Sequence, residues 1–361
     1  LINAPDRGIY KYATLADTGN PKTAVPVSYN SAIRHPEAEK WMEAMDQEMQ
    51  AHQLNGTWEL VARTNDMHVI GNKWVFAEKK DENGHTVRHK ARLTGRGDTQ
   101  IAGVDYEETY SPVVSGTALR IFLSIAATED LEVHQVDVTT AYLNAELREK
   151  IYMKQPQGYE NGKNEVCELR KALYGLKQAG REWHHTLRQH LESRGFKCLY
   201  KENSCFVMHG PPKTYVLVYV DDMAIGCADL TVLENFKTDL SSRFKITDGG
   251  PIHHMLGIKI TRDRENKKFI LSQGAYVDQM LERFGMSDAN PEDVPMAAID
   301  ELYKPGTLTE DVPYRAVVGS LLYLSNTTRP DLAFCAGVLG RFSGNFQDEH
   351  WKAAKKALRY V

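Results

Sequence analysis

The chain has 361 residues, of which 42% are hydrophobic and 25% are charged, and its formal net charge is −4. This composition is ordinary for a globular protein of two or three lobes, and the small negative charge argues against nucleic-acid binding through the net charge of the whole chain. The longest uninterrupted apolar run is about six residues, which excludes a membrane-spanning helix of about 20.

The cysteines and the N-terminus narrow the class of protein further. The five cysteines are odd in number and form no CxxC pair, which argues against a disulfide framework or a zinc cluster and favours a reduced, intracellular setting. The first residues, Leu1-Ile2-Asn3-Ala4, include no initiator Met and no signal-peptide regions. We interpret the chain as an internal piece of a longer protein or as a fragmentary gene model.

The N-terminal part is predicted to contain an extension, a helix and several strands. Residues 1–35 are rich in Pro, Asn, Ser and Thr and predict a loose linker. Over 36–54 apolar residues recur at helical spacing between acidic ones, which predicts an amphipathic helix. The expected strands are 57–61, 73–77 and a hairpin over 79–92 that turns at Asn83-Gly84.

The rest of the chain predicts a central unit of mixed helices and strands and then a helical lobe. The central elements are a helix over 115–128, a strand over 132–138, a helix over 179–195, a hairpin from 205–208 to 215–225 and a helix over 230–244. Short strands at 255–260 and 269–271 and helices near 276–284, 314–324, 331–342 and 349–360 follow. This order resembles a βαββαβ unit between two lobes and predicts an α+β fold.

A run of basic residues lies in and just after the predicted N-terminal hairpin. The run consists of Lys79, Lys80, Arg88, Lys90, Arg92 and Arg96. It is either the polar face of a solvated hairpin or a surface that contacts phosphate groups. The charges alone do not decide between the two.

Two adjacent carboxylates, Asp221 and Asp222, interrupt an apolar hairpin. Unpaired like charges lose their hydration when they are buried, so we expect a cation at this turn. Asp137 lies near the end of the strand predicted over 132–138, where a lone Asp is most often a cap or turn residue. In a split βαβ unit, however, that strand and the hairpin lie side by side, which would bring the three acids together. Three carboxylates suit Mg²⁺, and two such ions suit in-line phosphoryl transfer.

Several segments then resemble one family in order along the chain. Tyr219-Val220-Asp221-Asp222 matches the YxDD box of reverse transcriptases. The matching segments are KWVFAEKK (73–80), KARL (90–93), DYEETYSPVV (105–114), VDVTTAYLNAEL (136–147), LYGLKQAGREW (173–183), YVDDM (219–223), LGIKI (256–260), YRAVVGSLLYL (314–324) and TRPDLAF (328–334). Together they closely resemble the reverse transcriptase of copia-type LTR retrotransposon Pol polyproteins, over roughly residues 36–361.

The resemblance implies a right-hand polymerase with fingers, palm and thumb, a ferredoxin-like split βαβ palm and a helical thumb. The implied divisions are an extension (1–35), fingers (36–111 and 151–178), palm (112–150 and 179–262) and a thumb or connection (263–361) that stops before an RNase H domain. The implied function is RNA-directed DNA polymerase, a nucleotidyltransferase that adds dNTPs to a primer on an RNA or DNA template. The alternative is a catalytically inactive relic that at most binds nucleic acid.

The resemblance also assigns the catalytic site. Asp137 and Asp221 would be the carboxylates that bridge two Mg²⁺ ions, with Mn²⁺ as the alternative metal. The Val138 carbonyl would be an extra ligand, and Asp222 would be the third acid, nearer the primer terminus. Tyr142 would select deoxyribonucleotides by clashing with a 2′-hydroxyl, although an aromatic after a strand is also a common core residue.

Further residues would contact the substrates. Arg92 and Lys90 match residues that hold the triphosphate, with Lys73 as a weaker candidate, and their alternation puts Lys90 and Arg92 on one face of a strand. Other matching positions are Tyr174 and Gly175 beside the nucleotide, Lys177 and Gln178 as template contacts, and Leu256-Gly257 as the primer grip.

The sequence departs from the family pattern at several positions. Thr139, Tyr142 and Ala145 replace the usual Lys, Phe and Gly, and Gly180 replaces a proline. The run 95–98 replaces a KGF motif and adds an acid to a basic region. None of these changes removes a catalytic acid.

The resemblance implies partners and a setting as well. An RNA template, a DNA or RNA primer and dNTPs are expected, with RNase H and integrase domains as neighbours in the parent polyprotein, and no membrane. The expected location is the cytoplasm, in a virus-like particle, with the nucleus as the alternative, and not outside the cell. Asp17-Thr18-Gly19 spells an aspartic-protease signature, but its polar setting indicates a chance match. No integrase-type zinc motif is present.

Overall fold

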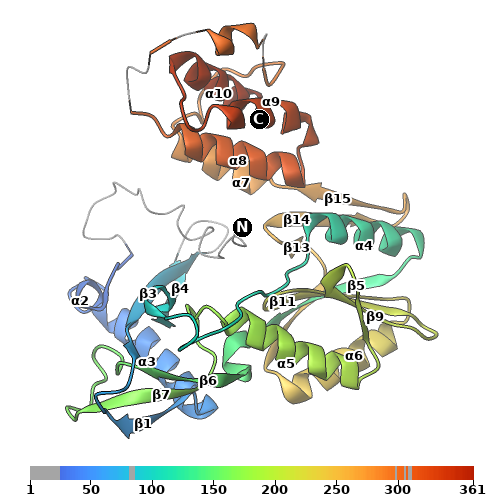
Figure 1. The fold of residues 1–361 in the computed structure, drawn as a ribbon. Helices are drawn as coiled ribbons and strands as arrows, with labels where there is room; N and C mark the ends of the chain where they lie inside the picture. The colour runs from blue at the N-terminus through green and yellow to red at the C-terminus, as the bar shows by residue number, and fades with distance from the viewer. Residues whose placement is uncertain (1–24, 81–85, 297–298, 305, 308–310) are drawn as a thin grey trace. The chain divides into compact units, whose positions relative to one another are not determined.

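The computed structural model describes residues 25–80, 86–296, 299–304, 306–307 and 311–361, and it mixes helices and strands along the chain (Figure 1). This mixture confirms the α+β prediction. The chain divides into two compact units. The first comprises the described residues up to Val114 with Val136–Met223 and Thr231–Asp248, and the second comprises the remainder. Among the described residues, no helix has both the length and the apolar character that crossing a membrane requires.

The first unit begins with two helices. Helix α3 (Ala38–Asn55) confirms the predicted amphipathic helix and ends at Gly56, whose φ of +57° forms a left-handed C-cap. A short helix, α2 (Tyr29–Ala32), precedes it and is capped by Ser28. The sequence did not predict this helical turn, which a local capping box favours; the assignment of residues 1–35 as a linker stays a prediction. Residues 1–24, with Asp17-Thr18-Gly19, lie outside the described residues.

A long hairpin packs against α3. Its strands are β3 (Asn72–Lys80) and β4 (Thr86–Gly95), which pair antiparallel. One face of the hairpin buries Phe76, whose ring lies edge-on to Trp41 of α3 with 5.5 Å between centroids. The predicted hairpin is confirmed but extends further at both ends, and its predicted turn at Asn83-Gly84 lies outside the described residues.

A four-stranded sheet completes this part of the first unit. Its order is β1 (Trp58–Ala62), β7 (Glu165–Lys171), β6 (Glu146–Met153) and β2 (Val69–Ile70). The sequence predicted β1 but neither β6 nor β7. Strand β6 is rich in Glu, Leu, Arg and Lys, which are helix formers, and tertiary pairing overrides that local preference.

A six-stranded sheet carries the adjacent carboxylates. Its order is β12 (Ile246–Pro251), β5 (Glu132–Val138), β11 (Asp222–Cys227), β10 (Thr214–Tyr219), β9 (Glu202–Met208) and β8 (Lys197–Leu199). Strands β10 and β11 are buried along most of their length, which explains why their sequence is an apolar run rather than an alternation. The helices α5 (Ala179–Ser193) and α6 (Leu230–Arg243) confirm the predicted ones. Because β5 and β11 are neighbours, the strand that carries Asp137 adjoins the hairpin, as predicted.

The second unit combines a small sheet with helices. Helix α4 (Gly116–Thr128) confirms the helix predicted over 115–128, and the Ser115 side chain caps its N-terminus by accepting a hydrogen bond from the Ala118 N–H. The sheet contains β13 (His254–Met255), β14 (Ile258–Asp263) and β15 (Lys268–Ser272). The helices that follow are α7 (Gly274–Arg283), α8 (Tyr314–Thr327), α9 (Ala333–Arg341) and α10 (Asp348–Tyr360). The helix predicted over 331–342 begins instead with a separate 3₁₀ turn at Pro330–Leu332.

The core of the helical part is apolar and continuous. Its fully buried members include Tyr314, Leu321, Leu339 and Leu358. The Tyr314 hydroxyl donates a hydrogen bond to the Leu339 carbonyl at 2.8 Å, which satisfies the one polar group that this side chain brings into the core.

Candidate active site

The adjacent carboxylates lie at a strained turn between β10 and β11. Val220 in this turn has a φ of +57°, a left-handed conformation that is unfavourable for a β-branched residue. The indole N–H of buried Trp183, in α5, donates a hydrogen bond to the Val220 carbonyl at 2.6 Å. The turn is therefore held against the core, and the backbone of Asp221 has a defined position.

The structure brings Asp137, Asp221 and Asp222 together. One carboxylate oxygen from each lies within 4.8 Å of those of the other two. The backbone N–H of Val138 donates to the Asp221 carbonyl at 2.8 Å and so ties the end of β5 to the turn. Asp137 is exposed, Asp222 is half-buried and Asp221 is buried with 7% exposure.

This donor set fits a divalent cation. Three carboxylates at this separation repel one another, and each offers the hard oxygen ligands that Mg²⁺ or Mn²⁺ accepts. Metal ligation by the Val138 carbonyl stays a prediction. The structure places Val138 beside the turn, because its N–H donates to the Asp221 carbonyl.

The chain turns sharply after Asp137 to place an aromatic ring. Thr140 adopts a left-handed conformation with a φ of +52° and begins a 3₁₀ helix, η2 (Ala141–Asn144). Tyr142 in this helix is half-buried. Its ring meets the ring of Tyr174 edge-on, with 4.6 Å between centroids. Two aromatic residues predicted to contact the nucleotide are therefore in contact with each other.

The β3–β4 hairpin carries Lys90 and Arg92 on one face. In the register of the two strands, Lys90 pairs with Ala77 and Arg92 with Val75, while Phe76 and Ala91 point to the buried face. The Arg92 guanidinium lies 4.5 Å from the centroid of the Tyr174 ring, a cation–π contact. A single ring thus connects Arg92 to Tyr142.

Three glycines let two backbone segments approach each other closely beside the ring of Tyr174. The N–H of Gly95 donates to the Tyr174 carbonyl at 2.8 Å. A Cβ on Gly175, whose φ is +89°, would lie 2.3 Å from the Gly95 carbonyl oxygen, and one on Gly97 would lie 2.1 Å from the Gly175 oxygen. The sequence predicted a functional role for Gly175 but not for Gly95 and Gly97, which it showed only as a departure from the family pattern. The Gly-x-Gly spacing of these two residues was the signal that could have indicated a close backbone approach.

Asp98, the acid that the run 95–98 adds to the basic region, forms an ion pair with a near neighbour. Arg96 pairs with Asp98 at 2.5 Å, with both side chains exposed. The hydrogen bond from Arg96 lowers the pKa of Asp98 below its ordinary value. Asp98 thus stays charged and pairs with Arg96, so the two side chains together carry no net charge.

Gln178 and its neighbour Lys177 have different environments. Gln178 is fully buried, and its amide donates to the Asp105 carbonyl at 2.8 Å and accepts from Gln100 at 3.1 Å. This position favours an internal role over a direct template contact. Lys177 is exposed, and its ammonium lies 5.4 Å from the centroid of the Tyr106 ring. Of the two predicted template contacts, Lys177 has the accessible cation.

The predicted primer grip lies in the second unit. Leu256 and Gly257 form the turn between β13 and β14, and both are half-buried. Their backbone φ angles are +55° and +74°.

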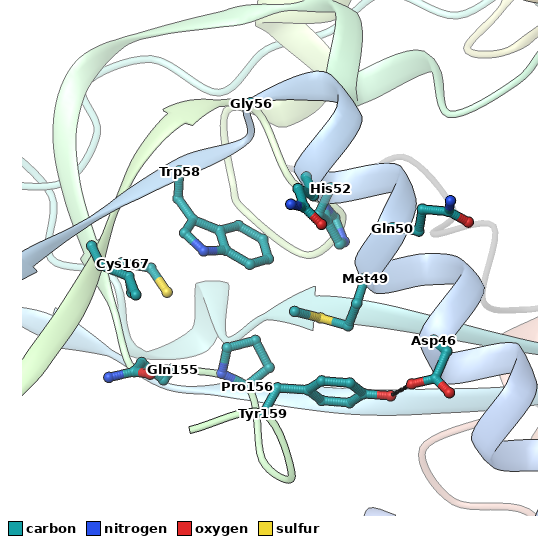
Figure 2. Close-up of a pocket in the computed structure, with 12 residues that line it drawn as sticks. Asp46, Met49, Gln50, His52, Gly56, Trp58, Gln155, Pro156, Tyr159 and Cys167 are labelled. Carbon is teal, nitrogen blue, oxygen red and sulfur yellow. Dashed lines mark hydrogen bonds between the residues drawn. The ribbon is translucent and has the colours of Figure 1, made fainter. Parts of the chain in front are cut away.

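A pocket of about 490 Å³ lies apart from the predicted site residues, none of which lines it. Figure 2 shows Trp58, Met49 and Pro156 around the hollow, with the Tyr159 ring below. The Tyr159 hydroxyl donates to Asp46 at 2.6 Å and ties the loop after β6 to α3. Burial, more than this bond, raises the pKa of Tyr159, which stays protonated.

Comparison with known proteins gives consistent matches. Residues 55–298 match the family model described as reverse transcriptase (RNA-dependent DNA polymerase). The retrovirus-related Pol polyprotein from transposon TNT 1-94 of Nicotiana tabacum is 41% identical, over 97% of this chain and 27% of its own length. That from transposon RE1 of Arabidopsis thaliana is 39% identical, over 95% and 24%. The chain thus spans about a quarter of these relatives.

Among solved structures, the chain is similar to a foamy viral protease-reverse transcriptase in complex with double-stranded DNA. The similarity covers 88% of this chain and 47% of the other, with 11% sequence identity and a TM-score of 0.43.

Proposed function

Since the chain belongs to the reverse transcriptase (RNA-dependent DNA polymerase) family found in copia-type retrotransposon Pol polyproteins, we propose that it is a working polymerase module. It adds dNTPs to a primer 3′-hydroxyl on an RNA or DNA template. The observation that carries this proposal is the convergence of Asp137, Asp221 and Asp222 within 4.8 Å at the Tyr219-Val220-Asp221-Asp222 turn.

The three carboxylates are the residues that would hold two Mg²⁺ ions, or Mn²⁺ in their place. Bound there, the ions supply activation of the attacking hydroxyl and neutralisation of the leaving pyrophosphate. Asp137, in β5, and Asp221, in the adjacent β10–β11 turn, would each offer a carboxylate oxygen as a ligand. The hydrogen bond from Trp183 to Val220 keeps the turn in place, so the ligands are positioned before substrate arrives.

Arg92 and Lys90 would bind the triphosphate. A guanidinium remains charged at any working pH and can bind two phosphate oxygens at once. The contact of Arg92 with Tyr174 orients its planar group, which reduces the entropy lost when phosphate binds. Lys90 shares the face of β4 with Arg92 and adds a second positive charge.

Tyr142 is proposed as the sugar gate, and replacing it with alanine should relax sugar selection. The Tyr142 ring is backed by Tyr174, so it resists displacement by a 2′-hydroxyl. In Tyr142→Ala we expect the ratio of kcat/KM for dNTP to that for rNTP to fall by about tenfold or more. Tyr142→Phe keeps the ring and should retain the selectivity of the wild type. An unchanged ratio in Tyr142→Ala would refute the gate.

The direct test of the function is primer extension. The purified chain, with Mg²⁺ and dNTPs, is expected to extend a DNA primer annealed to an RNA template. A chain that binds this duplex but adds no nucleotide with either Mg²⁺ or Mn²⁺ would be the inactive relic instead.

The wider assignments follow from the same proposal. Fingers would comprise 36–111 and 151–178, palm 112–150 and 179–262, and thumb or connection 263–361. The template, primer and dNTPs would be its ligands, and RNase H and integrase domains its neighbours in the parent polyprotein. The module would act in the cytoplasm within a virus-like particle, with the nucleus as the alternative.

A further inference from the structure

The turn between β13 and β14 has a conformation that its sequence does not favour. Met255 pairs with Ile258, so Leu256 and Gly257 form a two-residue hairpin loop. Both have positive φ angles, which is the pattern of a type I′ turn. Gly suits such a position, and Asn or Asp tolerates it, but Leu does not. A contact from outside the loop should therefore hold Leu256 in place.

That contact comes from helix α8. The hydroxyl of Tyr323 donates a hydrogen bond to the Leu256 carbonyl at 3.0 Å. The Tyr323 ring is half-buried and meets the ring of Tyr276, in α7, edge-on with 4.9 Å between centroids. Because the ring is packed, its hydroxyl has a fixed position, and the hydrogen bond fixes the carbonyl of the turn.

The end of α8 that carries Tyr323 is itself anchored. The hydroxyl of Thr328 donates to the side-chain carbonyl of buried Gln273 at 2.8 Å, and that of Thr327 donates to the same oxygen. Arg120, in α4, donates to the carbonyls of Asn326 and Thr327, each at 3.0 Å. The Tyr323 hydroxyl therefore lies near a helix end that is held by Gln273, which precedes α7, and by Arg120 of α4.

We propose that Tyr323 is a positioning residue for the primer grip. Its hydroxyl holds the Leu256-Gly257 turn in the shape that contacts the primer backbone, and it touches neither nucleotide nor metal. This role rests on the proposed polymerase function and on the assignment of the turn as the primer grip. Losing the hydroxyl should weaken the hold on the primer and leave the use of dNTP unchanged.

The variant Tyr323→Phe tests this role, because it removes the hydroxyl and keeps the ring against Tyr276. We expect primer–template to dissociate about fivefold faster, the factor for one ordinary hydrogen bond, with the KM for dNTP at saturating primer–template unchanged. Without nucleic acid, amide hydrogen exchange at 255–258 should also accelerate. Tyr303→Phe is the matched control, since Tyr303 is an exposed tyrosine of the same unit, and it should change neither quantity.

Three outcomes would overturn the proposal, and they are distinguishable. Unchanged exchange at 255–258 in Tyr323→Phe would show that the hydroxyl does not hold the turn. Faster exchange with unchanged primer release would show that the turn does not grip the primer. A wild-type chain that neither binds nor extends a primer would overturn the proposed function and this role with it. If the wild type is active, a negative result in Tyr323→Phe refutes only the role of Tyr323.

Discussion

The variant Asp221→Asn should lose primer extension by about a thousandfold or more while its fold is preserved. The substitution is nearly isosteric, but it replaces a charged ligand with a neutral amide whose N–H₂ group repels a cation, which costs several kcal/mol of transition-state stabilisation. The backbone contact of this residue, from the N–H of Val138 to the Asp221 carbonyl, does not involve the side chain. The measurement is the rate of single-nucleotide addition at saturating dNTP and primer–template.

The control for this experiment is an acid outside the cluster. Asp66 is exposed in a loop, and Asp66→Asn removes the same charge, so its rate should equal that of the wild type. Primer–template binding by Asp221→Asn should also persist, which separates loss of chemistry from loss of fold. Extension by Asp221→Asn within about twofold of the wild type would refute catalysis through this carboxylate.

The second large effect is expected on stability, from Gly175→Ala. The methyl group would lie 2.3 Å from the Gly95 carbonyl oxygen, so two backbone segments must separate. The left-handed conformation at φ +89° adds its own cost of about 1 kcal/mol. Together we expect the free energy of unfolding to fall by about 3 kcal/mol or more, measured by urea denaturation.

Substitutions at two other glycines distinguish the steric from the conformational contribution to the stability that Gly175→Ala loses. Gly195 has the same φ of +89° but nothing within 4 Å of its Cβ position, so Gly195→Ala should cost only the conformational part, about 1 kcal/mol. Gly97 has no positive φ, but its Cβ would lie 2.1 Å from the Gly175 oxygen, so Gly97→Ala should show the steric part alone. Equal losses at Gly175 and Gly195 would mean that the close approach contributes nothing.

Gly175→Ala should also weaken nucleotide binding. Gly175 follows Tyr174, whose ring contacts both Arg92 and Tyr142. Separating the backbone segments moves that ring, so the variant that remains folded should have a raised KM for dNTP. Gly195→Ala should leave this KM unchanged.

The sequence by itself determined the local elements and the chemistry of the acids. Helical spacing predicted α3, α4 and α5 nearly to their ends, because the periodicity of apolar residues depends only on neighbours a few positions away. The costly pair Asp221-Asp222 indicated a cation, and the split βαβ pattern predicted that Asp137 would join it. Each of these inferences depends on near neighbours in the chain or on one common motif.

Only the tertiary structure decided which distant residues meet. The ring of Tyr174 lies between Arg92 and Tyr142, the amide of Gln178 is buried against Asp105, and Gly97 lies against Gly175. Strands β6 and β7 were not predicted either. The helix-forming residues of β6 adopt a strand because they pair with β7. The contacts of Tyr174, Gln178 and Gly97 join residues that are 32 to 82 positions apart in the chain. No local propensity or spacing encodes such packing, because its energy exists only once the whole fold has formed.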